Sequence, residues 1–378
     1  MPGLSERERV TAIVYGDTFA LYDEPAFDEF VRPLYVRLEA NGIDTEIFRG
    51  KRCLDAGCGG GRGSVLMAQC GAREVVGIDL SSKNIESSRR RALQKRLVNL
   101  RFEQASLDSI PFDDESFDIV WCNGVLHHTE RPDQGLQEIS RVLKTGGWLW
   151  LYLYGSGGTY WYVMDWIRRE MRGVDIRDCI TQLRLMDSPI RRIAEWIDDW
   201  FVAFLRRYTE ADVTRRLEDL GFDHTGALTF GTSYDTSNRK NQADVDELAH
   251  MGEGDLRYFC RKQGKPRGGG CQLPDPLDGK GSRFTDPSIV TQFSESLTWI
   301  SSALAAVESR TGRSEAAMRI MVCRSIHSKV RSFLESDGVF DAAELQGHLI
   351  LVKSLIDDVQ QRIESRLIDG DVSDSQGA

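Results

Sequence analysis

The sequence predicts an α/β fold in which buried parallel strands alternate with helices. Residues 53–56 form the end of an apolar strand, which runs into a glycine-rich turn at residues 57–63 and then into a helix. Residues 75–79 form a second apolar strand, which ends in an acid about 20 residues after the turn. Together these two observations predict a strand–turn–helix–strand unit with a ligand site at the ends of its strands.

The glycine-rich turn is suited to a cofactor that contains a nucleoside. Positions without a side chain let a ligand lie against the backbone, and the start of the following helix supplies free N–H groups. The carboxylate of Asp79, at the end of the second strand, is placed to accept hydrogen bonds from both hydroxyls of a ribose. We therefore expect the cofactor to lie across the two strand ends.

The glycine spacing narrows the choice of cofactor. The order here is Asp55-x-Gly57-x-Gly59-x-Gly61, and no register places glycines at all three positions of the dinucleotide fingerprint G-x-G-x-x-G. A G-K-[ST] triphosphate loop is also missing. A glycine turn alone could be a plain tight turn, so the remainder of the domain has to support a cofactor site.

Further strands and helices are predicted along the chain after residue 79. Residues 118–123 form another apolar strand, and a helix is predicted from about Pro132, a favoured first residue, to about residue 143. That helix should end at the glycines of residues 144–147, before a strand at residues 148–153.

This succession resembles the class I S-adenosylmethionine (SAM)-dependent methyltransferases of the Methyltransf_11 type, which include small-molecule enzymes such as ubiquinone and sugar methyltransferases. The resemblance is strong over residues 48–155 and extends weakly to about residue 262. It implies SAM as the cofactor and a Rossmann-like seven-stranded sheet of order 3-2-1-4-5-7-6. In that sheet residues 222–232 and 256–261 would form an antiparallel hairpin at the edge.

The resemblance also assigns site residues. The cofactor contacts would be Asp55, Gly57, Gly59, Gly61, Asp79, Leu80, Ser106, Leu107 and Asn123. The glycines would line the methionine portion, and Asp55 would hold its amino group directly or through water. Leu80 would pack on the adenine. Ser106 stands where the family commonly has an aspartate that meets the adenine amino group, and its hydroxyl can still accept a hydrogen bond. Asn123 would lie by the methionine end.

His127 and His128 follow the strand at residues 118–123, where it opens toward the expected pocket. In related O-methyltransferases a histidine at this place acts as general base, and the ordinary imidazole pKa of about 6.5 suits that role. Both are candidate catalytic residues, with His127 preferred and His128 as a residue that shapes the pocket. The alternative is that the imidazoles only pack beside the cofactor or cap the next helix.

Two segments outside the small core are candidates for covering the substrate. An amphipathic helix is predicted at residues 24–41, preceded by a segment that contains Tyr15. An insert at about residues 155–208 is expected to form a helical cap, or else a surface that packs on itself or on a partner. Tyr15, Tyr160 and Trp161 are the candidate substrate contacts. If the cap covers the pocket, its arginines could hold an anionic group; they are Arg168, Arg169, Arg172, Arg177, Arg184, Arg191 and Arg192.

Composition limits the class of protein. The 378 residues suggest about two domains, and the net charge of −10 argues against a large nucleic-acid-binding face. The eight cysteines include no C-x-x-C pair, so neither a metal site nor a disulfide framework is indicated, and reduced thiols in the cytoplasm are expected. No signal segment and no apolar run of membrane-spanning length occurs, so neither export nor membrane association is expected.

The predicted domain organisation follows the chain. It comprises an N-terminal lid segment at residues 1–47, the methyltransferase domain at 48–262, a linker at 263–285, a helical domain at 286–368 and a disordered tail at 369–378. The last predicted helix, at about residues 341–368, carries a heptad seam that could pack within the chain or pair two chains as a homodimer.

These inferences predict a cytoplasmic SAM-dependent methyltransferase that acts on an oxygen or nitrogen of a small molecule, in a biosynthetic pathway. Two alternatives stay open. One is a catalytically silent, methyltransferase-like module that assembles through its C-terminal helices, although such a module has no need of the intact glycine turn and Asp79. The other is a nucleic-acid methyltransferase, against which residues 123–126 lack the [N/D]-P-P-[Y/F] tetrad.

Overall fold

The computed structural model of the chain describes residues 4–156, 161, 164–165, 167–168, 171–185, 188–223, 227–228, 253–264 and 272–274. Of these, residues 161, 164, 165, 167 and 185 fall in a second compact unit, and the others belong to the first. The predicted C-terminal helical domain and tail lie outside the described residues, as does most of the predicted linker.

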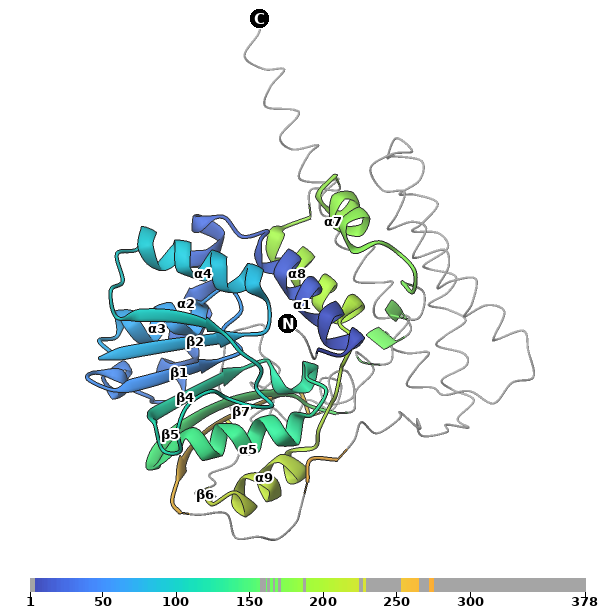
Figure 1. Cartoon of the computed structure of the whole chain (residues 1–378). Helices are drawn as coiled ribbons and strands as arrows, with labels where there is room; N and C mark the ends of the chain where they lie inside the picture. Colours follow the sequence, from blue (N-terminus) through green and yellow to red (C-terminus); the bar gives the residue numbers. More distant parts are fainter. Residues whose placement is uncertain are drawn as a thin grey trace, which may run out of the picture. The chain divides into compact units, whose positions relative to one another are not determined.

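The sheet has seven strands in the order β3-β2-β1-β4-β5-β7-β6, as predicted (Figure 1). The strands are β1 Arg52–Ala56, β2 Glu74–Asp79, β3 Leu100–Gln104, β4 Phe117–Asn123, β5 Leu143–Tyr154, β6 Phe222–Asp223 and β7 Asp255–Lys262. The first five are parallel, and β7 runs antiparallel to both β5 and β6. The strand order reverses between β1 and β4, which opens a crevice at the carboxyl ends of these two strands.

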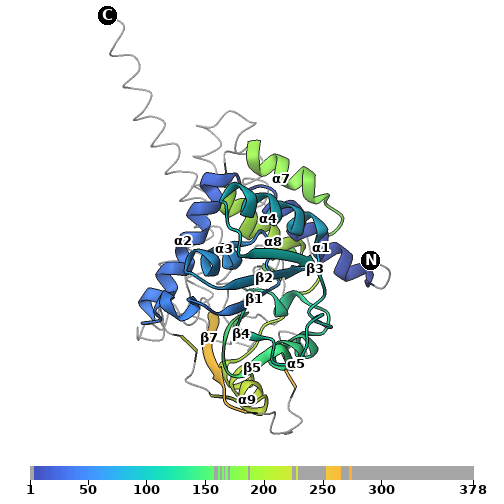
Figure 2. The ribbon, with the colours of Figure 1, turned by 60° about the vertical axis from the view of Figure 1, so that its left-hand side comes forward.

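Helices cover both faces of the sheet (Figures 1 and 2). The helices that the structure describes are α1 Glu6–Phe19, α2 Glu24–Ala40, α3 Arg62–Gln69, α4 Ser82–Gln94, α5 Pro132–Val142, α7 Ile176–Leu185, α8 Ile190–Phe201 and α9 Glu210–Asp219, with short 3₁₀ helices at Thr45–Phe48 (η1) and Leu126–His128 (η2). Two of the helices, α7 and α8, fall within the predicted insert.

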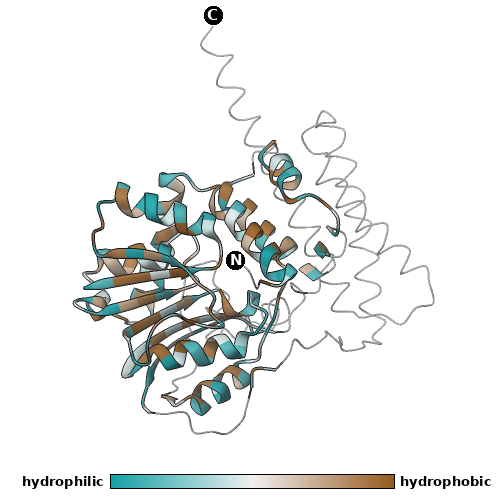
Figure 3. Ribbon diagram, viewed as in Figure 1, coloured by the Kyte–Doolittle hydropathy of each residue, from teal (hydrophilic) through white to brown (hydrophobic). Residues whose placement is uncertain are grey.

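The strands are apolar at successive positions because each face has its own core. Cys53, Val75 and Trp150 pack with α2 and α3 on one face, whereas the neighbouring Leu54 and Val76 pack with α5 and α9 on the other. Strands covered on both faces therefore read as continuous apolar runs rather than as an alternation. Brown and teal residues alternate along α5 in Figure 3, as expected of a helix with one buried face.

Three element boundaries differ from the predictions. β5 begins at Leu143, not at residue 148, and its register against β4 shifts between Phe117 and Ile119. The glycine expected to stop the preceding helix, Gly146, has a φ of +81° and lies in this irregular stretch of strand. Only Phe222–Asp223 of the predicted edge strand forms β6, and most of the remainder lies outside the described residues. The N-terminal segment is also helical, because a capping box between Ser5 and Glu8 starts α1.

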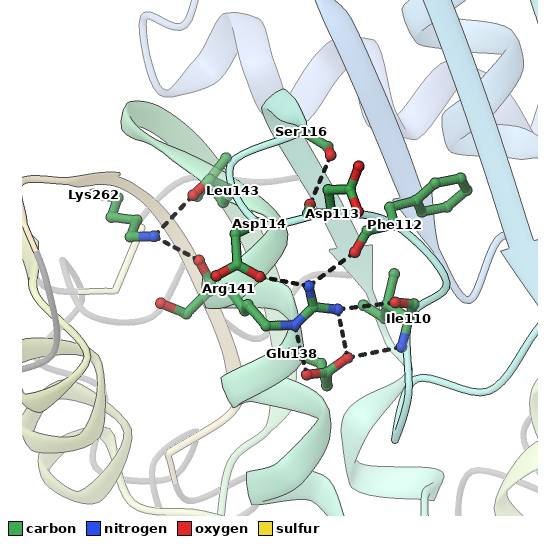
Figure 4. Close-up of polar contacts among 10 residues, drawn as sticks. Ile110, Phe112, Asp113, Asp114, Ser116, Glu138, Arg141, Leu143 and Lys262 are labelled. Atoms are coloured by element: carbon green, nitrogen blue, oxygen red, sulfur yellow. Dashed lines mark hydrogen bonds and ion pairs between the residues drawn. The ribbon is translucent and has the colours of Figure 1, made fainter.

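A polar cluster fixes the end of the sheet opposite the crevice (Figure 4). Arg141 of α5 donates hydrogen bonds to the carbonyl oxygens of Ile110 and Phe112, at 2.9 and 2.8 Å, and forms ion pairs with Glu138 and Asp114. Lys262, at the end of β7, donates to the carbonyl oxygens of Ser140 and Leu143, at 2.7 and 2.8 Å. These contacts connect the loop before β4 to the α5–β5 junction. They lie at the end of the sheet opposite the carboxyl ends of the parallel strands.

Candidate functional site

The glycine turn between β1 and α3 has a backbone that only glycine adopts without strain. Gly57 and Gly59 have φ values of +78° and +51°. A Cβ atom at Gly57 would lie 2.4 Å from Cγ1 of Val125, and one at Gly59 would lie 2.6 Å from Cε2 of Phe19. Gly61, with a φ of +88°, is the N-cap of α3, and a Cβ there would face Ser88 on α4. The turn is thus shaped by both conformation and close approach.

Asp79 joins the turn to α4. Its Oδ2 accepts a hydrogen bond from the backbone N–H of Gly59 at 2.8 Å, and its Oδ1 accepts from the N–H of Ser81 at 2.8 Å and from Nδ2 of Asn84 at 3.2 Å. Burial raises the pKa of this carboxyl group above its usual value. A carboxylate has about four acceptor positions, so the carboxylate is oriented and retains capacity for a ligand hydroxyl.

Asp55 lies at the tip of β1 with only 3% of its surface exposed. Its Oδ2 accepts a hydrogen bond of 2.6 Å from Oγ of Ser64. Burial raises the pKa of Asp55 to about 6, because the low-dielectric surroundings disfavour the charged form. A cationic group beside it would reverse that effect, so this carboxylate suits an ammonium ligand.

A cavity extends from the glycine turn across the crevice, under α1 and α8. The predicted cofactor residues in its lining are Asp55, Gly57, Gly59, Asp79, Leu80, Ser106, Leu107 and Asn123. Gly61 faces α4 instead and does not line the cavity. Asn123 accepts a hydrogen bond of 2.9 Å from Nε1 of Trp150 at its Oδ1, which leaves its amide N–H₂ as the group that can donate to a ligand.

α1 and α8 lie side by side over this cavity (Figures 1 and 2). Tyr15 of α1 lines the cavity, and its hydroxyl donates a hydrogen bond of 2.5 Å to Oδ1 of Asp198 on α8. Asp17, also on α1, forms ion pairs with Lys83 at 2.5 Å and with Arg177 at 3.3 Å. Of the other two predicted substrate contacts, Tyr160 lies outside the described residues, and Trp161 is a buried helical residue of the second compact unit.

The two histidines occupy different positions on η2. His127 is 0% exposed, and neither of its ring nitrogens has a hydrogen-bond partner among the described residues. Its ring stacks on Tyr154 with 3.9 Å between the ring centroids, and burial holds its pKa well below the usual value. The cavity lining includes His128 and not His127. The geometry therefore does not support the preference for His127, because that imidazole faces the ring of Tyr154.

His128 lines the cavity, and one hydrogen bond fixes its tautomer. Its Nδ1 lies 2.9 Å from the carbonyl oxygen of Phe204, which can only accept, so Nδ1 carries the hydrogen. The other nitrogen, Nε2, then holds the lone pair. It is buried, has no hydrogen-bond partner among the described residues, and lies 3.7 Å from Oδ1 of Asp198. Burial lowers the pKa of His128, and the nearby Asp198 carboxylate partly offsets this. The side chain is a neutral base at the cavity wall.

Sequence reasoning missed the residues that the insert contributes to the cavity. The described lining takes Ala194, Glu195 and Asp198 from α8 and includes none of the seven arginines considered for an anionic group. Arg168 donates to the carbonyl oxygens of Asp199 and Val202. Helical spacing could have indicated Asp198, because it lies four residues after Ala194 and therefore on the same face of the helix.

The lining contains one arginine, Arg62, which sequence reasoning also overlooked. Its guanidinium group lies 3.7 Å from the ring centroid of Phe30, and burial lowers its pKa to about 10.

Within the described part of the chain, no group of three or more acidic, histidine or cysteine side chains could hold a metal ion. The helices described there include none long and apolar enough to cross a membrane.

Comparison with known proteins identifies the domain. The family model described as "Methyltransferase domain" matches residues 54–151. The chain is 36% identical over 101 residues to a ubiquinone biosynthesis O-methyltransferase of Albidiferax ferrireducens, a match that covers 26% of this chain and 40% of that protein. It is 34% identical over 96 residues to the uncharacterized methyltransferase YcgJ of Bacillus subtilis, covering 25% and 38%.

A third relative is the 27-O-demethylrifamycin SV methyltransferase of Amycolatopsis mediterranei, 37% identical over 99 residues, which cover 26% of this chain and 36% of that protein. The chain thus spans about two fifths of the length of these relatives. The matched part contains the glycine turn, Asp79 and the strands that carry them. The part of the chain at residues 54–151 therefore belongs to the class I SAM-dependent methyltransferases, whose cofactor is S-adenosylmethionine.

Proposed function

We propose that this chain transfers the methyl group of S-adenosylmethionine to an oxygen or nitrogen atom of a small-molecule acceptor. The observation that carries the proposal is that one cavity is lined both by the predicted cofactor residues and by His128, whose Nε2 holds a lone pair. A cofactor pocket and a base that share one enclosed space are what a transfer reaction requires. The name of one relative, a ubiquinone biosynthesis O-methyltransferase, supports an acceptor from a biosynthetic pathway.

The residues at the β1–β2 end of the cavity fit the cofactor. Asp79, oriented by Gly59 and Ser81, would accept a hydrogen bond from a ribose hydroxyl. The turn leaves no room for side chains at Gly57 and Gly59, so the cofactor would lie against its backbone. Asp55, a buried carboxylate with a raised pKa, would pair with the amino group of the methionine portion.

When bound, S-adenosylmethionine supplies an electrophilic methyl group on a sulfonium. The protein then has to orient the acceptor in line with that group and remove a proton from it. His128 would accept the proton at Nε2, while its Nδ1–H stays on the carbonyl oxygen of Phe204 and fixes the ring. α1 and α8 would exclude water from the reacting atoms, because both helices contribute to the lining.

The charge of the cavity lining favours a small acceptor over a nucleic acid. Its described lining includes six carboxyl side chains, on Glu8, Asp55, Asp79, Asp108, Glu195 and Asp198, against one arginine. A phosphate backbone would be repelled by such a lining, in the same sense as by the net charge of −10.

The experiment is methyl transfer from isotope-labelled S-adenosylmethionine into a small-molecule cell extract. Wild type should produce labelled material that extracts with small molecules, and His128→Asn should reduce turnover about 10²–10⁴-fold. Cofactor affinity, measured on the same samples, should be unchanged in the variant. Cofactor binding with no labelled product in any fraction would instead favour the catalytically silent module.

A further inference from the structure

Asp198 is a cavity carboxylate whose partners are neutral hydroxyls and one imidazole. Its Oδ1 accepts a hydrogen bond of 2.5 Å from Tyr15, and its Oδ2 accepts one of 3.1 Å from Tyr154. Among the described residues, the one ion-pair partner within 4 Å is His128, whose pKa is lowered by burial. No described arginine or lysine lies within the 4 Å of an ion pair to this carboxylate.

The other cavity carboxyl groups already have a role. Glu195 pairs with Arg191 and Arg192 on the same helix, and Asp108 pairs with Arg131. The rest are at the predicted cofactor end or in the α1 capping box: Asp55, Asp79 and Glu8. Asp198 is the carboxylate left for the acceptor.

The position of Asp198 in the fold agrees with that role. His128 follows β4 and Tyr154 ends β5, so the group formed by Asp198 and these two residues lies beyond the tips of β4 and β5. Asp79, which would hold the ribose, lies at the tip of β2, two strands further across the sheet order. The acceptor therefore meets Asp198 at the opposite end of the cavity from the ribose.

Among the described residues, no group donates a hydrogen bond to Nε2 of His128. The lone pair of His128 Nε2 and the carboxylate of Asp198 face each other at 3.7 Å, and both are acceptors. Nε2 of His128 is buried without a donor among the described residues, which is unfavourable, whereas Asp198, with its side chain 22% exposed, already accepts from two hydroxyls. A ligand between these two acceptors has to donate. A hydroxyl group has one hydrogen and can satisfy one of them, whereas an ammonium group can donate to both. The adjacent rings of Tyr15 and Tyr154 also attract a cation.

We propose that the acceptor of this chain is an amine that binds as an ammonium ion between Asp198 and Nε2 of His128. This inference rests on the proposed methyl transfer and narrows its acceptor atom to nitrogen. The relatives named as O-methyltransferases do not oppose it, because the family match at residues 54–151 includes neither α1 nor α8.

The step balances with the groups present. The bound ammonium gives one proton to His128 Nε2, and the imidazolium formed is stabilised by the Asp198 carboxylate. The freed nitrogen lone pair forms the new C–N bond to the methyl carbon, and the pair of the broken C–S bond stays on sulfur. The product is a methylated ammonium ion, and His128 returns its proton to solvent.

The test is calorimetric binding of matched acceptor probes to the full chain, with and without S-adenosylhomocysteine. The probes are arylalkyl amines, each paired with the alcohol and the carboxylate of similar size, beginning with 2-phenylethylamine, 2-phenylethanol and phenylacetate. We expect the amines to bind at least about tenfold more tightly than their partners, because a buried charge-assisted pair is lost in the others. Asp198→Asn should abolish that preference and Asp198→Glu, which keeps the charge, should retain it.

The matched control is Glu195→Gln, on the same helix and in the same cavity, whose carboxylate is already paired with arginines; it should retain the amine preference. The inference is overturned if no amine binds, if alcohols or carboxylates bind as tightly, or if the preference survives Asp198→Asn. Binding of S-adenosylhomocysteine to the same samples separates the two proposals. If the cofactor binds but amines are not preferred, only this inference is overturned. If the cofactor does not bind, the proposed function is overturned, and the amine measurement still tests whether Asp198 selects amines.

Discussion

The hydroxyl group of Tyr15 lies 2.5 Å from Oδ1 of Asp198, a contact between residues 183 positions apart in the chain. Through it the N-terminal helix α1 and the insert helix α8 hold each other over the cavity. Both residues also line that cavity, so the contact holds the two covering helices together and forms part of the cavity wall.

Removal of this hydroxyl should loosen the cover of the cavity more than the fold. We expect Tyr15→Phe to speed amide hydrogen exchange in residues 6–19 and 190–201, with a loss of about 0.5–1.5 kcal/mol in the local opening free energy. Hydrogen-exchange mass spectrometry would measure this. Tyr35→Phe, which removes an exposed hydrogen bond to Gln69, is the control and should leave those segments unchanged. Equal exchange in wild type and Tyr15→Phe would contradict the role given to the contact.

Gly59→Ala should weaken cofactor binding, because the new side chain would meet the ring of Phe19 on α1. The new Cβ would lie 2.6 Å from the ring of Phe19 in addition to the strain of a positive φ. Gly42→Ala is a matched control, because Gly42 also has a positive φ, of +67°, but nothing lies within 4 Å of its Cβ position. Both variants should lose about 1 kcal/mol of unfolding free energy from strain, and Gly59→Ala should lose more. Chemical denaturation and cofactor titration of the two variants would separate strain from contact.

The raised pKa of Asp55 predicts how stability changes with pH in the unliganded chain. In the unfolded chain this carboxyl group titrates near its usual pKa of about 4, and in the folded chain near a pKa of about 6. The folded state therefore binds more protons between these values, so the contribution of Asp55 is fully present below pH 4 and is lost as pH rises through 6. Asp55→Asn should remove that part of the slope of unfolding free energy against pH. An unchanged slope would show that other groups cause it.

Cofactor affinity should show the opposite dependence on pH. Pairing with the methionine ammonium requires charged Asp55, so affinity should fall as pH is lowered through about 6. Asp55→Asn should bind weakly at every pH and show little dependence between pH 5 and 8. Titration of S-adenosylhomocysteine across that range would measure both. An affinity that is constant in wild type would mean that Asp55 does not contact the ammonium.

The lowered pKa of His128 predicts an acid limb for turnover below the ordinary range of histidine. The neutral imidazole, which acts as base, persists to lower pH because burial disfavours the charged form. The midpoint of the fall in turnover at saturating substrate should thus lie below pH 6.5, the ordinary pKa of a histidine. A limb centred above pH 6.5 would contradict the geometry of a buried, neutral base.

The sequence carried enough information for the fold because strands covered on both faces are apolar at successive positions, as in β1 and β2. The start of β5 was misplaced for a local reason. Gly146 reads as a helix stop, but its positive φ is accommodated within the irregular start of the strand. Residue type alone does not distinguish these two uses of glycine.

The residues at the β1–β2 end of the cavity could be named from the sequence because they are contiguous or follow consecutive strands. At the other end Tyr15 was named but Tyr154 and Asp198 were not, because the three come from distant segments that meet only in the folded chain. The choice between His127 and His128 depended on which ring faces the cavity, and adjacent residues on a short 3₁₀ helix give no periodicity from which to decide.

The most direct measurement is calorimetric binding of S-adenosylmethionine and S-adenosylhomocysteine to wild type, Asp79→Ala and Glu74→Ala. Asp79 and Glu74 are carboxylates at the two ends of β2, and Glu74 pairs with Arg52 and Arg101 at the far end of the strand from the cavity. We predict micromolar binding in wild type and Glu74→Ala and a loss of about tenfold or more in Asp79→Ala, since a charge-assisted hydrogen bond to the ribose would be removed. Equal affinity in all three proteins, or no binding by wild type, would contradict the assignment of this cavity to the cofactor.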